Sequence, residues 1–291
     1  MANSITLFKK YIDLLDEVYK RASLTSSLDS DAPLARQGAN ANEIIIPKIS
    51  MDALADYSRS GGYVAGDVTL TNETVTFNYD RGRSFTVDAM DNEETAGIAF
   101  GKLASEFIRT KVVPELDAFR FATYAGTSGI STVTGATLAT GADVVAALRS
   151  ATNTMDEDEV PMEGRLFITP TLMGMIQDLD TTKSREVMSR FSQIVLVPQS
   201  RFYTAIDLKD GTTEGEEAGG FAKAAAGADI NFMVILPDAL MQYTKHTVNK
   251  VVSPEENQTS DGWKFMFRSY GLADVYENKA AGIYLHKKAA S

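Results

Sequence analysis

The hydrophobic periodicity of this chain changes several times along its length, and this succession limits the folds open to it. Apolar residues recur at helical spacing over 4–22 and alternate at strand spacing over 44–88. Helical spacing returns over 92–125, and short strands and helices then alternate from 136 to 244. We therefore predict a mixed α/β (α+β) protein that begins with a separate helix and a long hairpin.

The first predicted helix, 4–22, is amphipathic. One apolar stripe of this helix is formed by Phe8, Ile12, Leu15 and Tyr19. Its apolar face is too wide to stay in water, so the helix must pack on something. The following stretch, 22–42, is small and polar, and it is expected to be extended with little core of its own. An arm that packs on a neighbouring subunit and a helix folded back on its own domain both fit this pattern.

Residues 44–90 are predicted to form a β-hairpin. Glycines at 61–62 mark a tip or bend, and the alternation on both sides of Gly82 predicts that the chain turns there. A two-stranded ribbon is marginally stable when it stands alone, and this one has few bulky residues for a core. The hairpin is therefore expected to lean on a partner.

The second predicted helix, 92–125, contains Pro114, which should kink it or split it in two. Thr140 and Asp143 are typical of a cap that starts the next helix. The later elements are predicted as strands at 166–168, 194–197, 232–236, 246–252, 263–270 and 283–285, a helix at 170–179, a short helix opening at 237–238 and an acidic, glycine-rich loop at 210–220.

The composition narrows the function. The net charge of −11 and the pI near 4.8 disfavour a protein that reads nucleic-acid sequence, because such a surface repels phosphates. The absence of cysteine excludes disulfides, thiolate metal sites and cysteine nucleophiles. No apolar run is long enough to cross a bilayer, and no secretory signal pattern is found, so no membrane partner is expected.

Few residues suit catalysis. His246 and His286 are the only histidines, and each is expected to be a half-exposed strand residue rather than a base. The acidic runs at 156–159 and 207–217 lack the spacing of a calcium loop and are expected to be solvated. The aromatic residues from Trp263 to Phe267 are expected to cover a sheet face. We predict no catalytic residue, no cofactor and no metal site.

The order of these parts resembles the major capsid proteins of tailed bacteriophages, the Hong Kong 97-type fold. Local segments that share the resemblance are Ser4–Tyr11, Tyr79–Arg83, Val113–Asp117 and Arg268–Tyr276. The resemblance implies an N-terminal arm (1–43), an E-loop hairpin (44–90), a spine helix with the first part of the P-domain (91–135), an A-domain (136–244), and returning P-domain strands with a C-terminal strand (245–291).

The resemblance implies self-assembly into pentamers and hexamers of an icosahedral shell that encloses double-stranded DNA without sequence-specific binding. It also implies a portal protein as a partner, location in the virion and assembly in the host bacterial cytoplasm; it leaves decoration proteins open. The residues predicted to be buried against a neighbour are Phe8, Ile12, Leu15 and Tyr19 of the arm, and Val75, Phe77 and Phe85 of the hairpin.

Two departures from the type member of that fold are visible. No lysine occurs between Lys48 and Lys102, so the hairpin tip has no amine for a covalent isopeptide link to a neighbour. The chain also has no room for a long N-terminal scaffolding segment, which predicts a separate scaffolding protein. The alternatives are an encapsulin, which shares the fold and would differ in its gene neighbourhood, and, more distantly, a metal-dependent α/β enzyme or an adhesion module.

Overall fold

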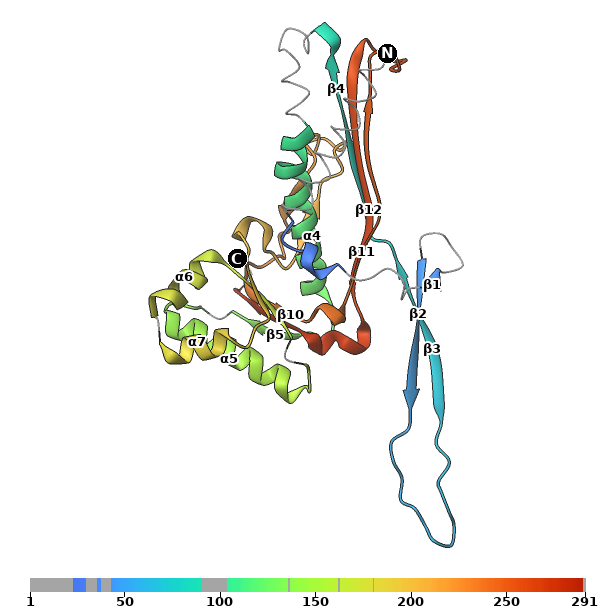
Figure 1. The fold of residues 1–291 in the computed structure, drawn as a ribbon, viewed down its shortest axis with the longest axis vertical. Helices are drawn as coiled ribbons and strands as arrows, with labels where there is room; N and C mark the ends of the chain where they lie inside the picture. Colours follow the sequence, from blue (N-terminus) through green and yellow to red (C-terminus); the bar gives the residue numbers. More distant parts are fainter. Residues whose placement is uncertain are drawn as a thin grey trace.

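The computed structural model describes residues 23–29, 36–37, 43–90, 104–135, 137–161, 163–179 and 181–289. They form a compact α/β domain, a long three-stranded sheet beside a helix, and a hairpin that extends away from both (Figure 1). The predicted arm helix, 4–22, and the beginning of the second predicted helix, 92–103, lie outside the described residues.

The α/β domain is built on a five-stranded sheet in the order β5-β13-β10-β6-β7. Only β10 runs against its neighbours; the other four strands point the same way. The strands span Ser131–Thr134 (β5), Arg165–Ile168 (β6), Gln193–Leu196 (β7), Ile230–Ile235 (β10) and Ile283–Lys287 (β13).

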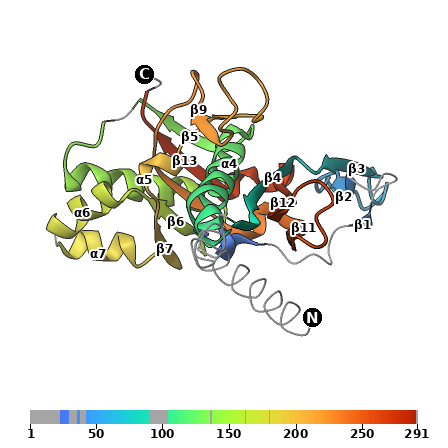
Figure 2. The ribbon, with the colours of Figure 1, turned by 90° about the horizontal axis from the view of Figure 1, so that it is seen from above.

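Helices cover both faces of this sheet (Figure 2). On one face, α5 (Gly141–Glu157), α6 (Pro170–Leu179) and α7 (Thr182–Met188) bury a hydrophobic core against alternate strand residues. On the other face, Phe121 and Tyr124 of α4 (Val113–Gly126) pack against the intervening strand residues. The predicted cap is confirmed, because Thr140 and Asp143 form a reciprocal capping box at the start of α5.

Pro114 does not split the second helix, which was one of its two predicted effects. Helical residues 104–107 lead into a π-helical turn, Ile108–Val112, which continues directly into α4. Proline cannot donate to the carbonyl four residues back, and its ring would collide with that carbonyl. The π turn just before Pro114 is wider, because its hydrogen bonds run between residues five apart, and it gives the ring more room beside the preceding carbonyls. The helix therefore continues although Pro114 donates no hydrogen bond.

The long sheet has the order β11-β12-β4, with strands Leu240–Val252, Gly262–Val275 and Tyr79–Asp88. The predicted turn at Gly82 is wrong, because β4 passes straight through it and pairs Gly82 with Arg268. A Cβ at Gly82 would lie 2.7 Å from the carbonyl oxygen of Phe267. The glycine therefore permits a close approach of two strands, a role that looks like a turn in the sequence.

The hairpin is formed by β2 (Glu43–Met51) and β3 (Val68–Thr76), and β1 (Arg36–Gln37) pairs with its base. Its tip spans 52–67, where Ser58 and Gly62 form a small bridge. The remaining elements are β8 (Ile206–Leu208), β9 (Phe221–Lys223) and short helical turns at Ser26–Leu28, Gln199–Arg201, Pro237–Ala239 and Glu277–Gly282.

The predicted domain ranges need two corrections. First, β4 lies in the long sheet with β12 rather than in the hairpin assigned to 44–90. Second, the sheet of the predicted 136–244 domain takes β5 and β13 from outside that range, and β13 lies between β5 and β10. Strand partners distant in the sequence leave no local signal. The periodicity therefore indicated strands at β4 and β13 without identifying their partners, and it did not predict β5.

Candidate inter-subunit surface

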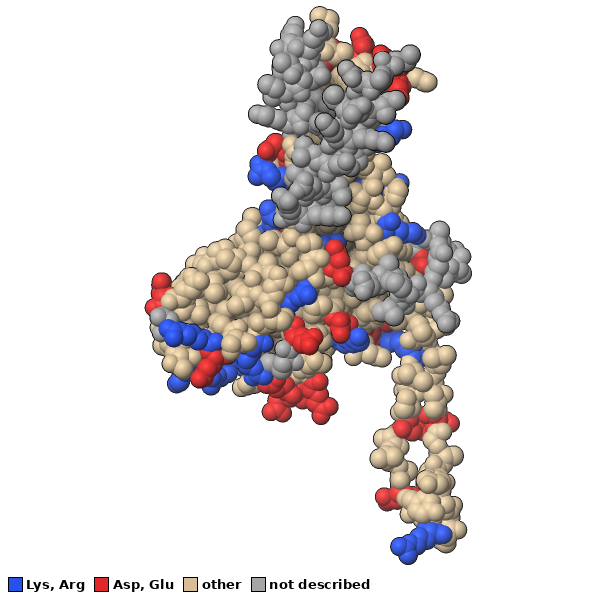
Figure 3. Space-filling model, in the orientation of Figure 1, with Lys and Arg blue, Asp and Glu red and all other residues tan. Residues whose placement is uncertain are grey.

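Exposed apolar side chains are concentrated on the hairpin. Among the described residues, twelve large hydrophobic side chains are exposed, and eight of them lie between residues 49 and 70. Isolated exposed hydrophobic residues are ordinary, but a group on one projecting element is a mark of a contact surface. In Figure 3 the hairpin is a narrow, mostly tan projection, with acidic groups at two levels and a basic group at its tip.

Four of these residues form one continuous surface. Ile49 lies opposite Leu70, and Met51 lies opposite Val68. Directly paired residues point to the same side of a ribbon, and so do residues two apart, so all four share one face. Their exposed fractions are 57%, 68%, 65% and 67% in that order. We call these four residues the apolar hairpin face.

The base of the hairpin packs on its own chain through its opposite side. Ile44 and Val75 are paired, and by the same alternation they point away from the apolar hairpin face. Both are buried, together with Met241 and Leu272 of the long sheet. The hairpin is thus held at its base by one side and presents apolar residues on the other side further out.

The junction between hairpin and long sheet is closely packed. The Phe77 ring stacks on Tyr270 with centroids 5.0 Å apart, and the Lys245 ammonium lies 4.7 Å from the Phe77 centroid. The Asn78 amide donates to the carbonyl of Ala273 at 2.8 Å and accepts from its N–H at 3.1 Å. These contacts fix the point where the chain leaves β3 and enters β4, and so aim the hairpin.

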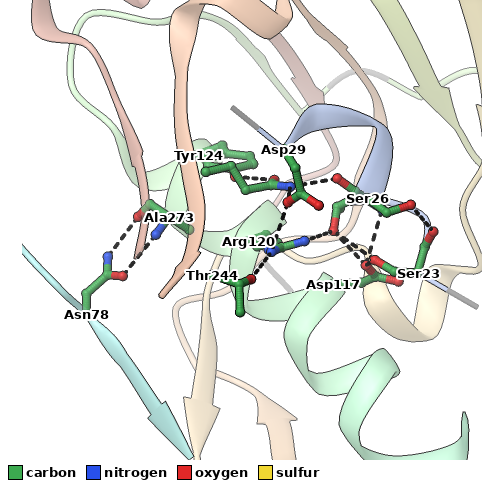
Figure 4. Close-up of polar contacts among 11 residues, drawn as sticks. Ser23, Ser26, Asp29, Asn78, Asp117, Arg120, Tyr124, Thr244 and Ala273 are labelled. Atoms are coloured by element: carbon green, nitrogen blue, oxygen red, sulfur yellow. Dashed lines mark hydrogen bonds and ion pairs between the residues drawn. The ribbon is translucent and has the colours of Figure 1, made fainter. Parts of the chain in front are cut away.

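A second anchored segment lies near the N-terminus of the described chain. The carboxylate of Asp117 on α4, 0% exposed, accepts hydrogen bonds from the Ser23 hydroxyl, the Leu24 N–H and both the N–H and hydroxyl of Thr25 (Figure 4). Arg201 lies 3.4 Å from the same carboxylate. A buried carboxylate requires such hydrogen bonds, so residues 23–29, which we call the arm anchor, supply donors that the core needs.

The arm anchor is also bound from β11. The buried Gln242 amide donates to the Thr25 carbonyl at 2.7 Å, and its oxygen accepts from the Tyr124 hydroxyl at 2.6 Å. Burial raises the pKa of Tyr124 far above its ordinary value, so this hydroxyl remains a donor. Leu28 is 1% exposed. The expectation that 22–42 contributes little core is therefore wrong for residues 23–29.

The predicted interface residues fall into two groups. Phe8, Ile12, Leu15 and Tyr19 lie outside the described residues. Val75 is 5% exposed and Phe77 is partly buried at the junction, whereas Phe85 is on β4 and packs on Phe107 and Phe265. Burial of these residues against a neighbouring subunit stays a prediction. Val75 has little exposed surface left that a neighbour could cover. The sequence reasoning did not single out the apolar hairpin face, although the alternation of Ile49 with Met51 and of Val68 with Leu70 is its signal.

The acidic runs have local partners. The Arg190 guanidinium donates to both carboxylate oxygens of Asp156, at 2.7 and 2.9 Å. Asp210 accepts hydrogen bonds from Thr213 and from the Thr212 N–H, which hold the pKa of its carboxyl below the ordinary value. Arg83 on β4 donates to the Glu217 carbonyl at 2.9 Å, so the loop is tied to the long sheet.

Two other kinds of site are absent from the described part of the chain. No three histidine or acidic side chains gather as a possible metal site there. Within the same ranges, no helix is long and apolar enough to cross a membrane. The aromatic cover of β12 is confirmed, because Phe265 and Phe267 are buried beside Trp263.

His286 is a buried residue of β13, not a half-exposed one as expected. It is 2% exposed, stacks on Phe232 at 4.8 Å, and its Nδ1 lies 3.1 Å from the Asn231 amide nitrogen. Burial lowers its pKa below the ordinary 6.5, because the charged imidazolium loses its hydration.

This burial predicts a dependence of stability on pH. The unfolded chain takes up a proton at His286 more readily than the folded one. The contribution of neutral His286 to the free energy of unfolding should therefore be fully present above pH 6.5, and it should be lost as the pH falls through the lowered folded pKa. Urea unfolding between pH 8 and pH 5 measures this loss. His286→Asn should flatten that part of the profile, and an unchanged slope in the variant would assign the loss to other groups.

Comparisons with known proteins show a shared fold. No family model and no curated protein matches the sequence. The structure is similar to that of a Mycobacterium phage Che8 protein, with a TM-score of 0.61, 13% identity and coverage of 87% of this chain and 86% of that one. A virus-like particle from Pyrococcus furiosus has a TM-score of 0.62 and 12% identity, covering 96% and 99%. The capsid structure of cyanophage P-SCSP1u gives 0.54 and 13%, covering 88% and 86%.

Proposed function

We propose that this chain, which has the fold of tailed-bacteriophage capsid proteins, is a major capsid protein that assembles into pentamers and hexamers of an icosahedral shell. The observation that carries this proposal is the apolar hairpin face. It projects from the body on a ribbon that is held only at its base, and its own chain leaves it in water. A second copy of the chain is the partner that a shell supplies at every such face.

The energetics suit a reversible assembly step. Burying one large aliphatic side chain contributes about 1.5–3 kcal/mol before the costs of association, so four of them form a modest contact. Each subunit in a closed shell makes several such contacts at once. Once the first contact has formed, the later ones form between groups that are already held close together, so their free energies strengthen the assembly. Modest individual contacts allow errors to be corrected before the shell closes.

The remaining parts of the proposal concern partners. We expect a separate scaffolding protein, a portal protein, and packaged double-stranded DNA that the shell encloses. A net charge of −11 supports enclosure without tight binding, because an acidic wall repels phosphates. The role is structural rather than catalytic, and its place is the virion, after assembly in the bacterial cytoplasm.

Electron microscopy tests the proposal directly. The chain is purified with and without co-expressed neighbouring genes and imaged in negative stain. Closed shells, or isolated pentamers and hexamers, are expected; monomers under every condition would overturn the proposal. Uniform shells of native size from the chain alone would remove the separate scaffolding protein. Portal and terminase genes next to this one would exclude the encapsulin alternative, which a cargo-enzyme gene would favour.

A further inference from the structure

The five-stranded sheet ends in two open edges. Its outer strands are β5 on one side and β7 on the other, and within the described ranges no strand pairs with the outer side of either. Open edges are usually protected by charged residues or proline, because their free backbone groups recruit other strands. Neither Ser131–Thr134 nor Gln193–Leu196 contains a charged residue or a proline.

Exposed apolar side chains mark the same two edges. Outside the hairpin, four of the large hydrophobic residues described in the structure are exposed. Three of the four are Val133 on β5, at 36%, and Ile194 and Leu196 on β7, at 37% and 46%. Solvent-exposed aliphatic residues therefore gather on the edges that also carry free backbone groups.

The three side chains point to the same face of the sheet. Ile194 and Leu196 lie opposite Leu166 and Ile168, which belong to the core beneath α5. Val133 lies opposite His286, whose ring stacks on Phe232 of that same core. Side by side, the two edges would place their aliphatic residues next to each other.

The backbone groups of the two edges are complementary. The Gly135 N–H donates into the sheet to Lys287, so by alternation Thr132 and Thr134 direct their N–H and C=O groups outward. The Val197 N–H donates inward to Ile168, so Ile194 and Leu196 direct theirs outward. The two strands also point the same way.

We propose that β7 of one copy pairs in parallel with β5 of the next copy, so that the sheet continues from subunit to subunit around a capsomer. Placing Ile194 opposite Val133 lets the Ile194 N–H donate to the Thr132 carbonyl and its carbonyl accept from the Thr134 N–H. Direction, hydrogen bonding and side-chain face all agree in this register. The inference rests on the proposed shell function and names one of its contacts.

A second copy is the occupant that these observations favour. The partner edge must be short, uncharged, parallel and apolar on the α5 face, and the other edge of the same sheet has all four properties. An interface that joins one patch to a different patch of an identical subunit propagates from copy to copy, and it closes into a ring when the rotation allows. Each subunit then uses both of its edges.

Engineered cysteines test the pairing in a chain that has none of its own. The double variant Val133→Cys, Ile194→Cys is assembled under reducing conditions and then, after removal of the reductant, treated with a short bis-maleimide, which forms a thioether with each of two nearby thiols. We expect a ladder of covalent oligomers on a denaturing gel, ending at pentamer and hexamer. The matched control, Val133→Cys with the exposed Asn153→Cys on α5, should stay monomeric on the gel.

A proline substitution tests the backbone contact separately. Thr132→Pro removes an N–H that points out of the sheet, so the subunit should keep its melting temperature and lose capsomer assembly. Val133→Pro removes an inward N–H and should lower the melting temperature. The edge pairing would be overturned, and the shell function would stand, if three results came together. The wild type would form shells, Thr132→Pro would assemble normally, and the double-cysteine variant would give no ladder of covalent oligomers. A wild-type chain that never assembles would overturn both.

Discussion

Replacing Leu70 with glutamate is expected to abolish shell assembly and leave the isolated subunit as stable as the wild type. Leu70 is one of the four residues of the apolar hairpin face, 68% exposed and opposite Ile49. In the free subunit the new carboxylate stays in water, so the free energy of unfolding should change by no more than about 0.5 kcal/mol. In the assembled state it would be buried without a partner, which costs more than the contact contributes.

The neighbouring position supplies the control. Thr71 is also exposed and lies on the same strand, but it points to the other side of the ribbon, opposite Lys48. Thr71→Glu introduces the same charge and should permit assembly. Light scattering and electron microscopy measure assembly, and urea unfolding measures stability. Equal assembly of the two variants would show that the apolar hairpin face is not a subunit contact.

Replacing Asp117 with alanine is expected to lower the free energy of unfolding by about 3–5 kcal/mol, the range for removing one member of a buried charged network. Its carboxylate is fully buried and accepts hydrogen bonds from Ser23, Leu24 and Thr25. Without it those donors lose their partner, and Arg201, whose guanidinium lies 3.4 Å from this carboxylate, loses its ion pair.

Asp156→Ala is the matched control, because Asp156 is also a helical aspartate paired with an arginine, but the pair is exposed to solvent. Its loss should cost no more than about 1 kcal/mol. Limited proteolysis adds a local measurement: the Asp117 variant should be cleaved within 23–29 under conditions in which the control is protected. Equal destabilisation of the two variants would contradict the role assigned to the arm anchor.

The sequence predicted best those elements whose signals are local. Thr140 and Asp143 form a cap in any chain that starts a helix there, and the helix 170–179 has the predicted bounds. Local signals gave a wrong prediction where a residue typical of a turn was needed for a tertiary contact instead. Gly82 follows Asp80-Arg81 and so suggests a turn. It lies instead within β4, whose partner strand β12 is almost two hundred residues away in the chain. Pro114 was predicted to kink or split its helix, and the helix is not split, because it continues through a π turn.

The sequence by itself therefore determined the periodicities, the caps, the fold class and the acidic, cysteine-free surface, because each follows from residues close together in the chain. Only the tertiary structure decided which strands share a sheet, since backbone hydrogen bonding carries no residue code and β5 pairs with β13 across about half the chain. It also decided which apolar residues stay exposed. Val75 and Leu70 alternate in one strand with similar character, and only the position of the long sheet buries the first and leaves the second for a neighbour.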